Sequence, residues 1–246
     1  MKKFLRIAEH SIEFLDDRFY PVETENGMIY YPSVTTVLDV YPKGAQFEQW
    51  LKDVGNSAGV IATRAAESGS KVHDAIYKLD EGIELEWNDA VYSFEEWQGI
   101  LRFKDFYDRF KPKDIAHETM IYSHKHKYAG MADKVCEIDG KIWLIDYKFG
   151  NAIYQTYWLQ IVAYKNAWNE IHPNMKVEEV GILHLKAATR TEGKKGSIQG
   201  VGWRLAQPDQ THERLYEIFL KTLDIFYFEN PDPRPKNLIY PSKIKL

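Results

Sequence analysis

Cysteine is almost absent from this chain of 246 residues, which contains only Cys136. A lone cysteine cannot form an internal disulfide, and it excludes zinc and iron–sulfur sites held by four cysteines. Scarce cysteine is typical of proteins in a reducing compartment. We therefore expect a cytoplasmic, intracellular location, which would be the host cytoplasm if the protein is encoded by a phage.

Long apolar runs are missing as well. None approaches the roughly 18 consecutive apolar residues of a membrane-spanning helix. The N-terminal stretch MKKFLRIAEH has too few apolar residues before Glu9 for the core of a signal peptide. The phosphate-binding pattern Gly-x-x-x-x-Gly-Lys-Ser/Thr is also absent, since GKKGS at 193–197 lacks the first glycine. We expect neither membrane contact nor use of ATP.

The composition that remains is that of a globular domain. Hydrophobic residues make up 44% of the chain, charged residues 28%, and the net charge is −4. This charge disfavours a protein that coats nucleic acid, but an enzyme acting on nucleic acid needs only a local basic strip. Such a strip, in which only Glu192 is acidic, is formed by Lys186, Arg190, Lys194, Lys195 and Arg204. The alternative interpretation is a solvated hairpin tip.

The apolar periodicity predicts an α/β (α+β) fold. Short strands are expected within the first 31 residues, with a helix at 33–38 whose N-cap is Ser33. Further helices are predicted at 45–54, 56–80, 89–110, 153–170 and 209–229. Strands are predicted at 114–123, 131–138, 141–148, 177–186 and 199–205. This order favours a mixed central sheet flanked by helices.

The chain is interpreted as a single domain over residues 1–246. Strands and helices occupy 1–112, the core occupies 113–230, and a proline-rich extended tail occupies 231–246. Within the helix at 56–80, small and apolar residues at three- and four-residue spacing predict the buried face: Ala62, Ala65, Gly69, Val72, Ile76 and Leu79.

Two acidic residues are expected to meet in a tight hairpin. Asp139-Gly140 is a preferred two-residue type I′ turn, so Ile138 should pair with Lys141. Continued along the strands, this register places Asp133 opposite Asp146, with Cβ atoms about 5 Å apart. Lys148, two residues beyond Asp146, shares its face.

Opposed carboxylates next to apolar residues repel each other, and a single lysine cannot neutralise both. A hard divalent cation such as Mg²⁺ or Mn²⁺ can, so the pattern indicates a metal site with Lys148 at its edge. A surface ion pair is the alternative for any single Asp-x-Lys match. Asp139-Gly140-Lys141 is a second such match, and it has the composition of a turn.

The segment YAGMADKVCEIDGKIWLIDYKFG, followed by QIVAY, resembles the PD-(D/E)xK nuclease superfamily in its RecB-like branch. The matching motifs run from Gly130 to Asp133, from Asp146 to Lys148 and from Gln160 to Tyr164, with an upstream Gly-x-x-x-His at Gly69 to His73. YPSVTTVL and HETMIYS are similar to segments of phage-encoded and mitochondrial genome maintenance exonucleases. Together the matches span about residues 31–168.

The resemblance implies a restriction-endonuclease-like core with an N-terminal helical elaboration, and it implies roles for individual residues. His73, Asp133, Asp146 and the Tyr147 carbonyl would be metal ligands. Asp133, Asp146 and Lys148 would be catalytic, with Lys148 positioning or activating the attacking water. The resemblance would also give Glu118, Gln160 and Tyr164 contacts to the site or to DNA outside the metal's own ligands. Independently of the resemblance, the basic strip adds Lys186, Arg190, Lys194 and Lys195 as candidate DNA contacts.

The expected function is a Mg²⁺- or Mn²⁺-dependent DNA exonuclease that prefers single-stranded or free-ended DNA. It would need no iron–sulfur cluster, and replication or recombination proteins are possible partners. Three alternatives stay open: a structure-specific endonuclease of the same fold, a non-catalytic DNA-binding module, and a structural protein in which both aspartates are merely solvated.

Overall fold

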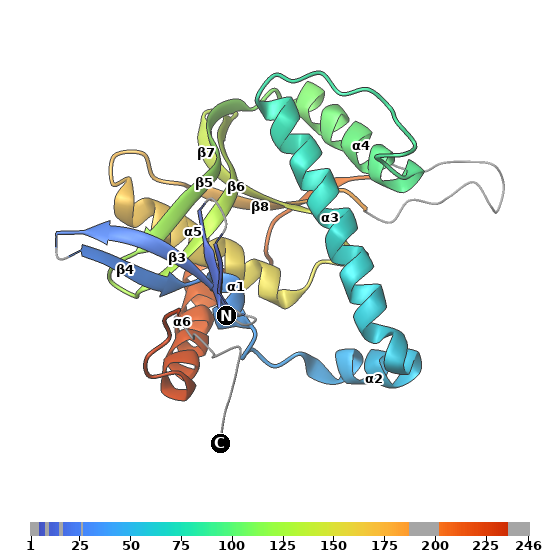
Figure 1. Ribbon diagram of the computed structural model, residues 1–246. Helices are drawn as coiled ribbons and strands as arrows, with labels where there is room; N and C mark the ends of the chain where they lie inside the picture. Colours follow the sequence, from blue (N-terminus) through green and yellow to red (C-terminus); the bar gives the residue numbers. More distant parts are fainter. Residues whose placement is uncertain (1–4, 8–9, 15–16, 26, 187–201, 236–246) are drawn as a thin grey trace, which may run out of the picture.

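The computed structural model describes residues 5–7, 10–14, 17–25, 27–186 and 202–235. A five-stranded mixed sheet packs against helices, and a small antiparallel sheet precedes it in the chain (Figure 1). The predicted α/β class with a mixed central sheet flanked by helices is confirmed.

The N-terminal sheet is antiparallel throughout, in the order β1-β2-β3-β4. Its strands are β1 (Leu5–Ile7), β2 (Ile12–Phe14), β3 (Asp17–Thr24) and β4 (Gly27–Pro32). β3 is not among the short strands expected here, FLRI, IEFL and MIYY, because Pro21 lies in its middle and proline disfavours a strand interior. Pro21 nevertheless pairs with Tyr30 of β4.

The central sheet has the order β5-β6-β7-β8-β9. Its strands are β5 (Lys113–Ser123), β6 (Tyr128–Ile138), β7 (Lys141–Lys148), β8 (Glu179–His184) and β9 (Arg204–Ala206). Among the described strand pairs of this sheet, β7–β8 alone is parallel, and α5 (Gln155–Ile171) connects these two strands. A parallel pair needs such a crossover, which explains the helix between them.

The other helices are α1 (Val34–Leu38), α2 (Gly44–Val54), α3 (Ala58–Asp80), α4 (Phe94–Phe110) and α6 (His212–Glu229). Ser33 caps α1 as predicted, since its hydroxyl accepts a hydrogen bond from the Thr36 N–H at 2.9 Å. α4 begins later than predicted, because Ser93 and Glu96 form a capping box that fixes its first turn. Among the described helices, none combines the length and apolar character that crossing a membrane requires.

The two faces of the central sheet contribute to separate apolar cores. Leu144 of β7 and Ile182 of β8 pack with α5 and α6, whereas Ile145 and Leu183 pack with α3 and α4. Neighbouring residues of a strand point to opposite faces. Asp146 therefore lies on the α5 side of the sheet, two residues beyond Leu144.

The predicted buried face of α3 is wrong for its first half. Val72, Ala75 and Ile76 are buried, but Ala62 and Ala65 are exposed. Among the described residues from 44 to 71, none is buried. α2 and the first half of α3 extend away from the two sheets instead (Figure 1). Helical spacing identified the face, but it carries no information on whether the core reaches that far along the helix.

Gly130 leaves room for an aromatic ring, which gives a test of this packing. A Cβ on Gly130 would overlap the ring of Tyr164, so we expect Gly130→Ala to destabilise the protein by about 1–3 kcal/mol. Gly59→Ala on exposed α3 meets nothing nearby, so it should be neutral or stabilise by about 0.5–1 kcal/mol. Urea unfolding of both variants is the measurement, and equal effects would contradict this packing.

Candidate metal centre

The β6–β7 hairpin has the predicted turn. Asp139 and Gly140 have φ values of 50° and 77°, both positive as a type I′ turn requires. Ile138 pairs with Lys141, and the antiparallel pairs continue to Lys134 opposite Ile145. The predicted register is confirmed over this length.

The paired residues of β6 and β7 end at Lys134 and Ile145, one residue before Asp133 and Asp146. The Tyr147 N–H donates to Oδ2 of Asp133 at 2.7 Å, so a side chain occupies the place of a backbone partner. On the other neighbouring strand, Glu118 has a left-handed φ of 40° and interrupts the pairing of β5 with β6. The predicted direct opposition of Asp133 and Asp146 is therefore not part of the ladder, since the Asp133 side chain accepts the Tyr147 N–H there.

Three residues far apart in the sequence gather at this irregularity. His73 of α3, Glu118 of β5 and Asp133 of β6 each offer a ligand atom, and these atoms lie within 4.8 Å of one another. Glu118 was expected only as a contact outside the metal's own ligands. Glu118 has a left-handed backbone where it joins the candidate ligands, and the spacing of residues along a strand does not reveal such a conformation.

The orientation of the His73 ring is set by a backbone carbonyl. Its Nε2 lies 2.8 Å from the Tyr147 carbonyl oxygen, which can only accept, so Nε2 carries the proton. In the neutral ring, Nδ1 is then a bare acceptor, and it lies 3.7 Å from Oδ2 of Asp133. A cation placed near both atoms could take both as ligands. The Tyr147 carbonyl, a predicted ligand, is thus the acceptor that orients His73.

The electrostatics of the cluster favour a bound cation. Burial, followed by the negative charge of Asp133, raises the pKa of Glu118 to about 7. An imidazole nitrogen and two carboxylates are donors that suit Mn²⁺ and Mg²⁺. The donor set therefore fits the predicted cofactor, with Glu118 in addition to the predicted His73 and Asp133.

Asp146 lies beside this cluster but outside the group of three. It is only 1% exposed, and its Oδ1 accepts a hydrogen bond from Gln160 Nε2 at 3.3 Å. Its Oδ2 lies 2.7 Å from Lys148 Nζ, an ion pair whose angle leaves Oδ2 without a well-directed hydrogen bond. Burial raises the pKa of Asp146 to about 6, and the charge of Asp133 contributes in the same direction.

Lys148 stays protonated despite its burial. Desolvation alone would lower its pKa, but the charges of Asp146 and Asp133 raise it above the ordinary value. Its Nζ also lies 4.7 Å from the ring centroid of Tyr157. Tyr157 was not predicted as a site residue, although it precedes Gln160 by one helical turn and shares its face.

Gln160 and Tyr164 act together as their spacing predicts. Nε2 of Gln160 lies 3.2 Å from the Tyr164 hydroxyl, and Gln160 also bonds to Asp146. Both side chains are buried. Their contacts hold Asp146 in place from α5, and the ring of Tyr164 packs on Gly130 three residues before Asp133.

The predicted basic strip is only partly described. Lys186 forms an ion pair with Glu95 at 2.8 Å, and its Nζ lies over the ring of Phe149. Arg204 of β9 pairs with His184, which in turn pairs with Lys148. Arg190, Lys194 and Lys195 lie outside the described residues.

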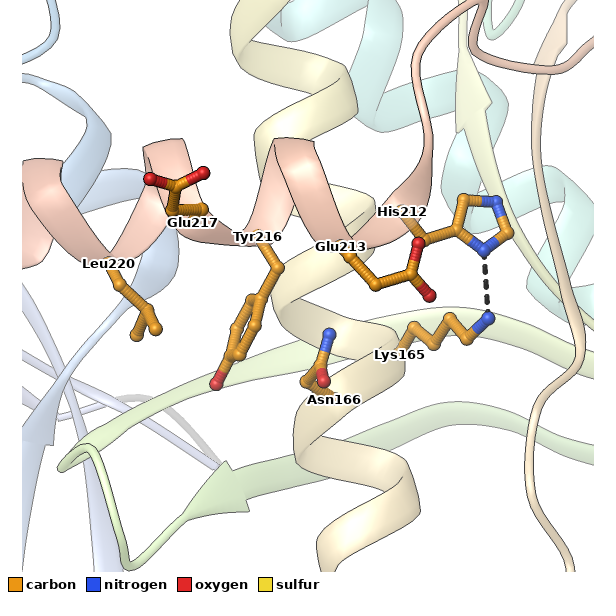
Figure 2. A pocket seen from close by; sticks show the side chains of 7 residues that line it. All are labelled: Lys165, Asn166, His212, Glu213, Tyr216, Glu217 and Leu220. Atoms are coloured by element: carbon orange, nitrogen blue, oxygen red, sulfur yellow. Dashed lines mark hydrogen bonds between the residues drawn. The ribbon is translucent and has the colours of Figure 1, made fainter.

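A cavity of about 260 Å³ between α5 and α6 is separate from this cluster (Figure 2). Lys165 lies inside it and donates to Nδ1 of His212 at 2.8 Å. Its lining residues are Lys165, Asn166, His212, Glu213, Tyr216, Glu217 and Leu220. No predicted site residue is among them, so the cavity is not the candidate active site.

Comparisons with known proteins do not identify the chain. No model of a protein family matches it. A search of curated proteins finds no match either.

The raised pKa of Glu118 predicts how stability depends on pH without metal. The folded-state pKa of about 7 lies above the ordinary 4.5, so the folded protein binds this proton more tightly than the unfolded chain. Stability should therefore fall as the pH rises through that window. In EDTA, Glu118→Gln should show a flatter dependence and, above the window, a gain on the order of 1 kcal/mol after allowance for solvent screening.

Thermal unfolding of both proteins across this pH range is the measurement. The raised pKa of Asp146 adds a pH dependence of the same sign to both proteins. The difference between the two stability curves therefore reports on Glu118. Parallel curves for wild type and variant would contradict the assigned environment of Glu118.

Proposed function

We propose that this protein is a metal-dependent DNA exonuclease that acts on single-stranded or free-ended DNA. The observation that carries the proposal is the grouping of His73, Glu118 and Asp133 beside the Asp146–Lys148 ion pair. Acidic ligands next to a protonated lysine suit phosphodiester hydrolysis, in which a water molecule adds across a P–O bond. The resemblance of the motifs to RecB-like nucleases supports the same reaction.

The ligands of the metal ion would come from His73, Glu118 and Asp133, with Asp146 within electrostatic reach. A bound Mg²⁺ or Mn²⁺ lowers the pKa of a water molecule and polarises a phosphate oxygen. The protein's part is to hold two carboxylates and an imidazole nitrogen close enough together to share one cation. The hydrogen bond from His73 to the Tyr147 carbonyl and the bond from the Tyr147 N–H to Asp133 fix both ligands on the backbone of one residue.

Lys148 supplies positive charge rather than acting as a base. A lysine whose pKa is raised remains protonated at neutral pH, so it cannot take a proton from water. Its ammonium group, held by Asp146 and the Tyr157 ring, is placed to stabilise the negative charge that a phosphodiester gains in the transition state. Gln160 completes this support through Asp146.

The projecting helices support a preference for free ends. Phe47 and Leu51 of α2 and Val60 and Ile61 of α3 are exposed apolar side chains on the segment that extends from the sheets. The exposed aromatic ring of Phe47 can stack on an unpaired base, which the outside of a duplex does not offer. Without ATP-driven unwinding, single strands, flaps and frayed ends are the accessible substrates.

Removing either member of the ion pair should abolish cleavage. We expect Asp146→Asn and Lys148→Ala to lower kcat by at least about 10²-fold, since each removes preorganised charge at the phosphate. The measurement uses single-stranded DNA labelled at the 5′ or the 3′ end, in Mg²⁺, Mn²⁺ or EDTA. Activity in EDTA, or full activity in either variant, would refute the proposal.

The second Asp-x-Lys of the chain offers a matched control. Lys141 lies directly after the hairpin turn and forms an exposed ion pair with Glu179 at 2.6 Å. Lys141→Ala removes a lysine from the same motif and the same strand, away from the cluster. It should cleave as wild type does.

Dependence on a free end is tested with a closed circle. A single-stranded circle should resist the enzyme, while the linear strand of the same sequence is consumed from its termini. Gel electrophoresis over time distinguishes the two substrates. Equal rates on circle and line would instead identify a structure-specific endonuclease, the runner-up function.

A further inference from the structure

A buried network of charges ties the end of α3 to two strands of the central sheet. Lys134 Nζ lies 2.7 Å from Asp80 Oδ1 and 3.0 Å from Asp114 Oδ1. The side chains of Lys134 and Asp80 are each only 3% exposed. Buried charges are costly to keep unless they are paired, so this arrangement is strongly specified.

His117 extends the network to the C-cap of α3. Its Nδ1 lies 2.8 Å from Asp114 Oδ2, and its Nε2 lies 2.7 Å from Glu81 Oε1. Carboxylates only accept, so both ring nitrogens donate and the ring is an imidazolium. Partial burial opposes this charge, but the hydrogen bonds to Glu81 and Asp114 outweigh it and raise the pKa of His117.

The network lies directly behind the candidate ligands. His117 and Lys134 are paired across β5 and β6, and each is the chain neighbour of a ligand: His117 of Glu118, and Lys134 of Asp133. Asp80 lies seven residues after His73 on the same helix, about two turns away. Tyr77, one turn after His73, also packs its ring edge-on to His117 at 5.8 Å.

We infer that His117 and Lys134 are positioning residues that set the distance between the helix-borne ligand His73 and the strand-borne ligands Glu118 and Asp133. α3 has no buried contact along its described first half, so its placement depends on its C-terminal half. The network is one polar part of that attachment, beside the Lys71–Glu96 ion pair and the His73 bond to the Tyr147 carbonyl. The apolar part includes Val72, Ala75 and Ile76. The inference rests on the metal centre of the proposed function.

Metal affinity should therefore depend on His117 and Lys134, although neither residue is a ligand of the metal ion. A carboxylate pair and an imidazole bind a cation well only if they stay within a few tenths of an ångström of their places. Loss of partners behind metal ligands typically costs about 10- to 100-fold in affinity. The same loss in a purely structural ion pair would lower thermal stability and leave metal affinity unchanged.

The test compares Mn²⁺ binding in the full-length protein and in His117→Gln. His117 is 19% exposed, so this variant should fold, with only a modest fall in the Tm measured in EDTA. We expect the Mn²⁺ concentration that gives half of the maximal thermal stabilisation to rise by about 10-fold or more. Glu81→Gln, which removes one partner of the ring, should show a smaller rise.

Lys141→Met is the matched control, because it breaks the exposed Lys141–Glu179 pair on the same sheet. Its Mn²⁺ midpoint should equal that of wild type. A lower Tm in His117→Gln and Glu81→Gln with unchanged Mn²⁺ midpoints would overturn the inference. Absence of Mn²⁺ stabilisation in wild type would overturn it together with the metal centre, whereas stabilisation without DNA cleavage would refute only the nuclease proposal.

Discussion

The register of the β6–β7 hairpin is the constraint on which the candidate site depends. Two residues with positive φ, Asp139 and Gly140, close the hairpin so tightly that only one register is available. A slip of one residue would turn Leu144 and Asp146 to the α3 side of the sheet and Ile145 to the α5 side. The side chain of Asp146 would then leave Gln160 and lose that hydrogen bond, while Lys148, on the same face of β7, would turn with it.

The charges of the site are balanced by neighbours in two different ways. Asp146 has Lys148 and Gln160, so its burial is offset within the protein itself. Among the described residues, neither Glu118 nor Asp133 pairs with a lysine or arginine, and burial raises the pKa of Glu118 to about 7. This contrast separates a carboxylate that the fold neutralises from carboxylates that are left for a cation, and it is a stronger argument for a metal centre than the presence of acidic residues alone.

Local chemistry made much of this arrangement predictable. The Asp-Gly turn, the Ser33 cap and the alternation along β7 each depend on neighbouring residues, so they could be read from the sequence. Glu118 could not be recognised as a ligand, because its left-handed backbone arises from the irregular pairing of β5 with β6. The partnership of Lys134 with Asp80 was equally hidden, since the two residues are 54 positions apart and meet only through packing.

The proline within β3 and the exposed half of α3 are features that local sequence patterns did not predict. The described pairing of β2 with β3 stops at Phe19, so Pro21 has a partner strand only on the β4 side, an arrangement that propensity does not anticipate. The exposed half of α3, with α2 before it, contributes no buried side chain over the described residues 44–71. Folding places little constraint on these side chains. Selection on this segment would therefore act through the molecules that it contacts, and any residues kept there by evolution would reflect those contacts.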